Sequence, residues 1–110
     1  MKVNVLGTEY EIILDAPDEL LPEDADGAVD VTLKRIVIAE FVVDRNSVKD
    51  LNAYRKKVLR HEIVHAFLYE SGLWNNSGHV NAWGQNEEIT DWIAIQSPKL
   101  FTAFKEAGAL

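Results

Sequence analysis

Two histidines and a glutamate near the middle of the chain have the types and the spacing of a hydrolytic metal site. His61, Glu62 and His65 form the pattern His-Glu-x-x-His. On a helix, residues four apart lie one turn above each other on the same face, so both imidazoles can reach one point. Glu62 is rotated from His61 by about 100°, which leaves its carboxylate near that point without making it a ligand. The pattern predicts two zinc ligands and a general base; two surface histidines beside a solvated glutamate are the alternative.

A third ligand is needed, because a catalytic zinc site usually has three protein ligands and one position for water. The downstream candidates are His79, Glu87, Glu88 and Asp91. Glu87 and Asp91 are four apart on a predicted helix, so if Glu87 binds the metal, Asp91 can orient a histidine ligand from behind. Acids at a helix start are also favourable by themselves, but the place of Glu87, with 21 residues between it and His65, favours a ligand. Glu88 and His79 are the alternative metal ligands.

Two pairs of short strands are predicted in the first half of the chain. Residues 2–14 alternate apolar and polar side chains around a turn at Gly7 and Thr8, as a β-hairpin does. Residues 28–32 and 35–42 are expected to form a second pair. The strand over 35–42 is the more apolar of the two, so it is either central or beside a cleft, and it is our candidate edge for an added peptide strand.

One long helix is expected to carry the histidines. Apolar residues recur at helical spacing over residues 47–71, where Asn46 or Ser47 can cap the start and Gly72 can cap the end. Two further helices are predicted, one over residues 86–97 and one over residues 98–107. Pro98 is expected to end the first of them and to begin the second.

These elements predict a single α+β domain over residues 1–110. Its small, mostly antiparallel sheet would pack on the long active-site helix, which two shorter helices follow. Between the strand pairs, residues 15–27 carry many acidic side chains and are interpreted as a solvated loop.

The composition argues against several classes of function. With 18 acidic and 11 basic side chains the net charge is −7, which makes nucleic acid an unlikely partner. The chain has no cysteine, so any metal must be held by His, Asp or Glu. No apolar run approaches the roughly 18 residues of a membrane span, and the N-terminus does not resemble a secretory signal. We therefore expect no membrane partner and a cytoplasmic location.

The two motifs together resemble a known signature. The His-Glu-x-x-His pattern followed by residues 86–91, Asn-Glu-Glu-Ile-Thr-Asp, is similar to the paired motifs of the gluzincin metallopeptidases. In thermolysin-like members the second motif is Asn-Glu-x-x-Ser-Asp. The resemblance implies that Glu87 is the third zinc ligand, that Asp91 supports His61 and that Glu62 is the catalytic base.

The whole chain also resembles small zinc metallopeptidase-like proteins encoded by phages or prophages, through residues 1–10, 57–67 and 86–94. This resemblance implies a minimal zincin-like domain and a peptide or protein substrate. Peptide bonds would be hydrolysed by a zinc-activated water, with Glu62 acting as base and then as acid. A non-catalytic zinc-containing interaction module of phage origin is one alternative. A SprT-like peptidase with His79 as third ligand is another.

The chain departs from the thermolysin type in one respect. Those enzymes stabilise the oxyanion with a downstream tyrosine and histidine, and neither residue type occurs after Asp91. Zinc itself, His79, Tyr54 or Tyr69 would have to supply that stabilisation.

Overall fold

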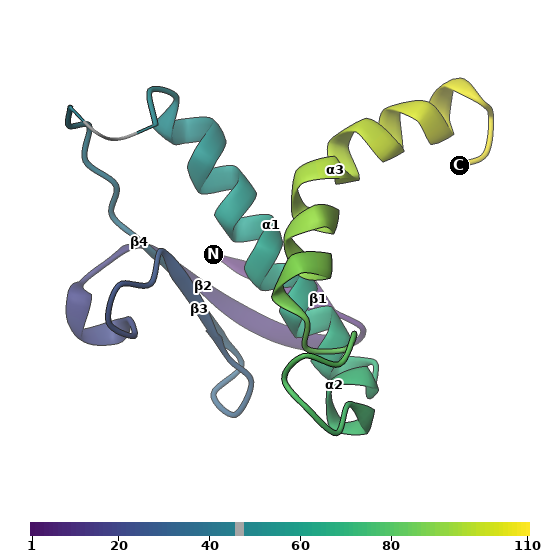
Figure 1. The fold of residues 1–110 in the computed structure, drawn as a ribbon, viewed down its shortest axis with the longest axis horizontal. Coiled ribbons are helices and arrows are strands. Elements are labelled where there is room, and N and C mark those ends of the chain that lie inside the picture. The colour runs from purple at the N-terminus through teal and green to yellow at the C-terminus, as the bar shows by residue number, and fades with distance from the viewer. Residues whose placement is uncertain (46–47) are drawn as a thin grey trace.

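A four-stranded sheet lies beside two long helices in the computed structural model, which describes residues 1–45 and 48–110 (Figure 1). The elements are, in chain order, β1 (Lys2–Val5), β2 (Thr8–Ala16), a 3-10 turn η1 (Asp18–Leu20), β3 (Gly27–Asp30), β4 (Arg35–Ala39), α1 (Leu51–Glu70), α2 (Leu73–Asn76) and α3 (Glu87–Glu106). The predicted α+β class, with a small sheet followed by a long helix and further helices, is confirmed. Among the described residues, no helix has the length and apolar character needed to cross a membrane.

The sheet is mixed, and its order decides which strand is exposed at the edge. The order is β1-β2-β4-β3, with β1–β2 and β3–β4 antiparallel and β2–β4 parallel. The expectation that the strand over 35–42 is an edge is therefore wrong, and the alternative that it is central is confirmed. Three consecutive residues of β4, Ile36, Val37 and Ile38, are buried, as suits a strand covered on both faces. The two edge strands are β1 and β3, and both contact α1.

The turns differ from the prediction in detail. Leu6 and Gly7 join β1 to β2, one residue earlier than predicted, because Thr8 already belongs to β2. Residues 31–34 join β3 to β4 without a glycine. The carboxylate of Asp30 accepts hydrogen bonds of 2.9 and 3.1 Å from two backbone N–H groups of that turn. These bonds stabilise the turn in the absence of a glycine.

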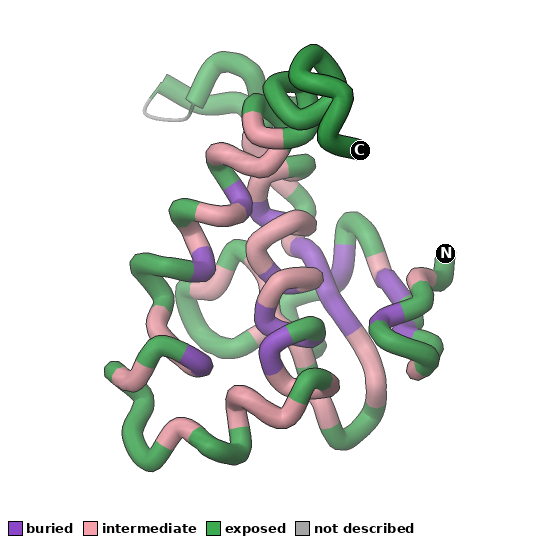
Figure 2. The backbone as a smooth tube through the Cα atoms, turned by 90° about the vertical axis from the view of Figure 1, so that its right-hand side faces the viewer, coloured by how far each residue is buried: buried purple, intermediate pink, exposed green. Residues whose placement is uncertain are grey.

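One face of the sheet and the inner face of α1 form the core. Tyr10, Ile36 and Ile38 are completely buried there. Figure 2 shows the buried positions gathered along the strands and the helices that face them, while the C-terminal end of α3 is exposed. The remaining members of the core cluster are Val5, Ile12, Val58 and Ala66.

The helix that carries the histidines begins later than predicted. It starts at Leu51, with Asp50 as N-cap accepting a hydrogen bond of 3.0 Å from an N–H of the first turn. The predicted caps, Asn46 and Ser47, lie outside the described residues. Gly72 follows the helix with φ 90°, a left-handed conformation that favours glycine, so the predicted end is confirmed.

The predicted break at Pro98 is wrong, because α3 runs through it as one helix. A proline cannot donate to the carbonyl four residues before it, here that of Ala94. Arg60 of α1 supplies the missing donor: its Nε lies 2.5 Å from this buried carbonyl oxygen. The contact from α1 replaces the lost intrahelical bond. Figure 1 shows α3 bending away from α1 in its second half, as expected of a proline kink.

Candidate functional site

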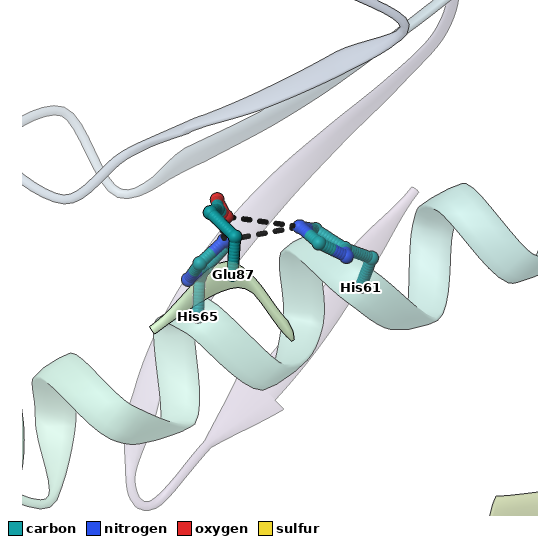
Figure 3. A group of neighbouring side chains, drawn as sticks. All are labelled: His61, His65 and Glu87. Carbon is teal, nitrogen blue, oxygen red and sulfur yellow. Dashed lines mark hydrogen bonds and ion pairs between the residues drawn. The ribbon is translucent and has the colours of Figure 1, made fainter. Parts of the chain in front are cut away.

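Three side chains from two helices converge on one point. His61 and His65 project from successive turns of α1, and Glu87 from the first turn of α3 (Figure 3). The two Nε2 atoms are 3.1 Å apart, and the Glu87 oxygens lie 2.8 and 3.0 Å from Nε2 of His65. Glu87 Oε2 is 3.5 Å from Nε2 of His61. The structure thus brings together the three residues that were predicted as metal ligands.

The spacing of these atoms fits one tetrahedral ion. Zinc binds nitrogen and oxygen at about 2.0–2.1 Å, so two ligands of a tetrahedral site lie about 3.3 Å apart. In this cluster the two Nε2 atoms are separated by 3.1 Å, and the longest of the three histidine–Glu87 distances given above is 3.5 Å. His65 is buried while the Glu87 side chain is 69% exposed, so the cluster is closed on one side and accessible on the other. This asymmetry is typical of a site with an open coordination position.

Asp91 lies behind the first histidine. Its Oδ1 is 3.1 Å from Nδ1 of His61 and 3.1 Å from Nζ of Lys57. Burial raises the pKa of the Asp91 carboxyl, but the hydrogen bonds from Lys57 and His61 outweigh burial and lower it below its usual range. Asp91 is therefore a carboxylate that accepts the Nδ1–H of His61, which leaves the Nε2 lone pair facing the cluster.

His65 is kept in the neutral form that a metal ligand needs, by burial rather than by a carboxylate behind the ring. Its pKa is lowered mainly by burial, and the nearby His61 lowers it further, although Glu87 opposes the shift. The neutral ring is the form that binds metals. Its Nδ1 is buried and has no hydrogen-bond partner in the described part of the chain. The ring is held by packing instead, edge-on to Trp74 at 5.8 Å between centroids.

Glu62 is a buried acid beside the cluster. It is only 7% exposed, and no residue of the described ranges 1–45 and 48–110 forms a hydrogen bond with its carboxylate. Burial, together with the charge of Glu87, raises its pKa to about 7. A carboxyl with a pKa near neutrality can both accept and donate a proton under physiological conditions.

Glycine is required where β3 passes over this acid. A Cβ at Gly27 would lie 2.9 Å from Cγ1 of Val58, 3.1 Å from Cδ1 of Ile38 and 3.2 Å from Cγ of Glu62. Any larger residue would push β3 away from α1. Gly27 therefore lets the edge strand close over Glu62.

Two pockets meet at the cluster and form a continuous cleft along β3. The first pocket, of about 480 Å³, lies toward the start of α1, and the second, of about 630 Å³, lies toward α2. Both are lined by Gly27, Glu62, Glu87 and Glu88. The predicted ligands and base thus lie where the two halves of the cleft join.

The edge of β3 offers backbone groups to this cleft. The N–H of Ala39 donates to the carbonyl of Asp26 at 2.9 Å, so residue 26 faces β4. Because hydrogen-bonded and free positions alternate in an antiparallel pair, Ala28 also faces β4. The N–H and C=O groups of Gly27 and Val29 therefore point to the open edge.

The alternative ligands lie outside the cluster. His79 is exposed in the loop after α2, where its Nδ1 accepts a hydrogen bond of 3.1 Å from the N–H of Asn81. Glu88 lies at the rim and lines both pockets. Within the described residues, the group whose donor atoms lie within 4.8 Å of one another consists of His61, His65 and Glu87.

Of the candidate oxyanion stabilisers, Tyr54 is the one that lines the cleft. It belongs to the first pocket, and its hydroxyl donates to Asp26, which raises the pKa of Tyr54 to about 12. Tyr69 packs instead against Trp74, with ring centroids 6.0 Å apart, and under the ammonium of Lys34 at 4.9 Å.

Two charged residues that line the first pocket were missed in the sequence. Lys57 lies one turn before His61 on the same stripe of α1, so helical spacing could have identified it. Asp26 belongs to the acidic segment before β3, where nothing distinguished it from its neighbours.

Comparisons with protein-family models, with curated proteins and with solved structures found no match to this chain. The site is therefore interpreted from its own chemistry. That chemistry comprises two oriented imidazoles, an accessible carboxylate and a buried acid of raised pKa, all facing a cleft beside a free strand edge.

Proposed function

We propose that the protein is a zinc-dependent metallopeptidase of the small phage type that its motifs resemble. The observation that carries the proposal is the convergence of His61, His65 and Glu87 at the ligand spacing of one tetrahedral ion. Glu62, a buried acid without a hydrogen-bond partner among the described residues, lies beside this point and supports a catalytic rather than a purely structural site.

The residues of the chain would divide the work as follows. His61, His65 and Glu87 hold the ion, and Asp91 keeps His61 in the correct tautomer. A bound zinc ion supplies a Lewis acid that lowers the pKa of water toward about 7 and polarises a carbonyl. Glu62 takes the proton from the attacking water and returns it to the leaving amine, a double role that suits its pKa of about 7.

The substrate would bind as an extended peptide beside β3. Gly27 and Val29 offer backbone donors and acceptors at the edge, as in β-augmentation. A peptide on this edge crosses from one pocket to the other above Glu62, so its scissile bond passes the cluster. Tyr54 lines the first pocket and is our candidate for oxyanion stabilisation, for which its hydroxyl would have to release its hydrogen bond to Asp26.

A non-catalytic zinc-containing interaction module is the second candidate. The observation that favours it is the apolar surface at the end of α3, where Phe101 is 58% and Phe104 is 42% exposed. The two rings are three residues apart on one helix, and contiguous exposed apolar surface marks sites of contact with other proteins. The two candidates differ in whether Glu62 has a chemical role.

Metal analysis and peptide hydrolysis test the proposal separately. We expect wild type to bind one zinc ion, Glu87→Ala to lose most of it, and Glu88→Ala and His79→Ala to retain it. If His79→Ala alone loses zinc, the SprT-like alternative replaces the gluzincin assignment. Glu62→Gln should retain the metal and abolish cleavage of a generic protein substrate such as casein. Cleavage that survives this change would refute the mechanism, and zinc binding without any cleavage by wild type would favour the interaction module.

A further inference from the structure

We propose that the first pocket is a subsite for a cationic side chain, lysine or arginine, next to the scissile bond of the substrate. The second pocket would take an uncharged side chain on the other side of that bond. This inference rests on the proposed peptidase function and adds a substrate class to it. It follows from the different chemistry of the two halves of the cleft.

The first pocket has an excess of negative charge. Five carboxylates and one ammonium line it: Asp26, Glu62, Glu87, Glu88, Asp91 and Lys57. Two of these carboxylates already have a partner in the pocket. Lys57 pairs with Asp91 at 3.1 Å, and Glu87 faces the two histidines. Glu62 is set apart by its burial and its place beside the cluster.

Two carboxylates, Asp26 and Glu88, have no cationic partner among the described residues. Asp26 accepts a hydrogen bond from the hydroxyl of Tyr54, which holds it at the wall of the pocket but does not neutralise it. Glu88 lies at the lip where the pockets join. A cation entering the pocket would meet both.

The buried carboxylate of Glu62 also lacks a partner in the pocket. The side chain of Glu62 is only 7% exposed and lines the pocket. Its carboxylate has no hydrogen bond within the described ranges. This buried acid lies where the two pockets join and is a binding feature in addition to the surface acids, because a cationic ligand group can pair with a carboxylate that no other group of the described residues satisfies. The walls beside it, Tyr54 and Val58, offer apolar surface to the alkyl stem of a lysine or arginine.

The second pocket lacks this character. Apart from the three glutamates that it shares with the first and the imidazole of His65, its lining is apolar or carries neutral amides. Trp74 forms one wall, edge-on to His65. The other lining residues that it does not share are Ala28, Val29, Val80, Asn81, Gln85, Asn86 and His65. Such a surface suits an uncharged side chain.

The edge strand places the two pockets on opposite sides of one peptide bond. The first pocket contains the residues just before β3 and its first residue, Gly27. The second contains Gly27 and the two residues that follow it. A peptide extended along β3 therefore passes at Gly27, which lies over Glu62, from the half that adds Asp26 and Asp91 to the shared glutamates to the half that adds no further carboxylate.

Peptide binding to wild-type protein that a chelator keeps free of zinc tests the subsite without turnover and leaves the carboxylate of Glu62 in place. The probe is a set of fluorescent, uncharged eight-residue peptides in which one position at a time carries lysine, norleucine or glutamate. We expect one position at which lysine binds about fivefold to tenfold more tightly than norleucine, since ion pairs with partly exposed carboxylates are individually weak. Glutamate should bind most weakly there. The preference should shrink toward unity in 1 M NaCl, where the screening length is about 3 Å.

Variants identify the residues responsible. Adding Asp26→Asn or Glu88→Gln should lower the lysine-to-norleucine ratio by at least about twofold each. Glu23→Gln, an exposed acid of the same segment that lies outside the cleft, is the matched control and should leave the ratio unchanged. Equal binding of lysine and norleucine at every position, no binding of any peptide, or a preference unaffected by both variants overturns the proposal. A lysine preference in a protein whose wild type binds zinc but cleaves nothing would uphold the subsite and refute the peptidase function.

Discussion

Replacing Glu62 by glutamine should stabilise the metal-free protein at alkaline pH. Glu62 is 7% exposed, and the described part of the chain supplies no hydrogen bond to its carboxylate. The folded protein therefore holds the ionised form in unfavourable surroundings, while the unfolded chain solvates it freely. The side chain of glutamine has nearly the same size and stays neutral at every pH. The variant thus removes the cost of ionisation without opening a cavity.

The size of the effect follows from the pKa of Glu62, which is raised from 4.5 to about 7 in the folded state. Each pKa unit corresponds to about 1.4 kcal/mol, so the ionised group costs about 3 kcal/mol at pH 8, above both pKa values. Because the folded pKa is the higher one, the cost is absent below 4.5, grows between pH 4.5 and 7, and is complete above pH 7. At pH 5 the same relation leaves less than about 1 kcal/mol.

Urea unfolding in the presence of a chelator measures this difference. Unfolding free energies of wild type and Glu62→Gln would be compared at pH 5 and pH 8, with the same m-value as evidence of two-state behaviour. We expect the advantage of the variant to rise by about 2 kcal/mol between these two pH values. Glu23→Gln, which changes an exposed acid, should differ from wild type by no more than about 0.5 kcal/mol at both.

A variant that is destabilised at pH 8, or whose advantage is the same at pH 5 and pH 8, would refute the reasoning. The first result would mean that the ionised carboxylate has a favourable partner in solution. The second would mean that its pKa is not raised by folding. Either would also remove the physical basis for Glu62 as a proton acceptor and donor near neutral pH.

Three further predictions concern the surroundings of the site. Asp91→Asn should weaken zinc binding by about tenfold to a hundredfold, because an amide cannot orient His61 as the carboxylate does. Competition with a chromophoric chelator measures the affinity, and an unchanged affinity would exclude this role. Gly27→Ala should lower the unfolding free energy by about 1–3 kcal/mol, because the added Cβ would make short contacts with α1. Gly78→Ala, where a Cβ meets nothing within 4 Å, should be nearly neutral, and equal effects of the two changes would contradict the close approach of β3. Arg60→Ala should lower the unfolding free energy by about 2 kcal/mol in wild type and by clearly less in a Pro98→Ala background, where a backbone N–H returns to bond Ala94. An additive double-mutant cycle would disprove that Arg60 replaces the bond lost at Pro98.

The sequence by itself determined the local features of this protein. His61 and His65 share a face because of the helical repeat, and the same repeat places Asp91 one turn after Glu87. The end of α1 at Gly72 and the presence of four strands also follow from short-range patterns. These features depend on residues close in sequence, so composition and spacing were enough to predict them.

Only the tertiary structure decided how these pieces meet. The convergence of Glu87 with the two histidines depends on the packing of α3 on α1, and the identity of the edge strand depends on the parallel pairing of β2 with β4. The hairpin pattern could not reveal that pairing, because it joins strands that are distant in sequence. Pro98 shows the same limit, since a donor 38 residues earlier, Arg60, permits a helix that local rules exclude. The physical reason is common to all three: each outcome is set by contacts between elements, whose energies no local spacing encodes.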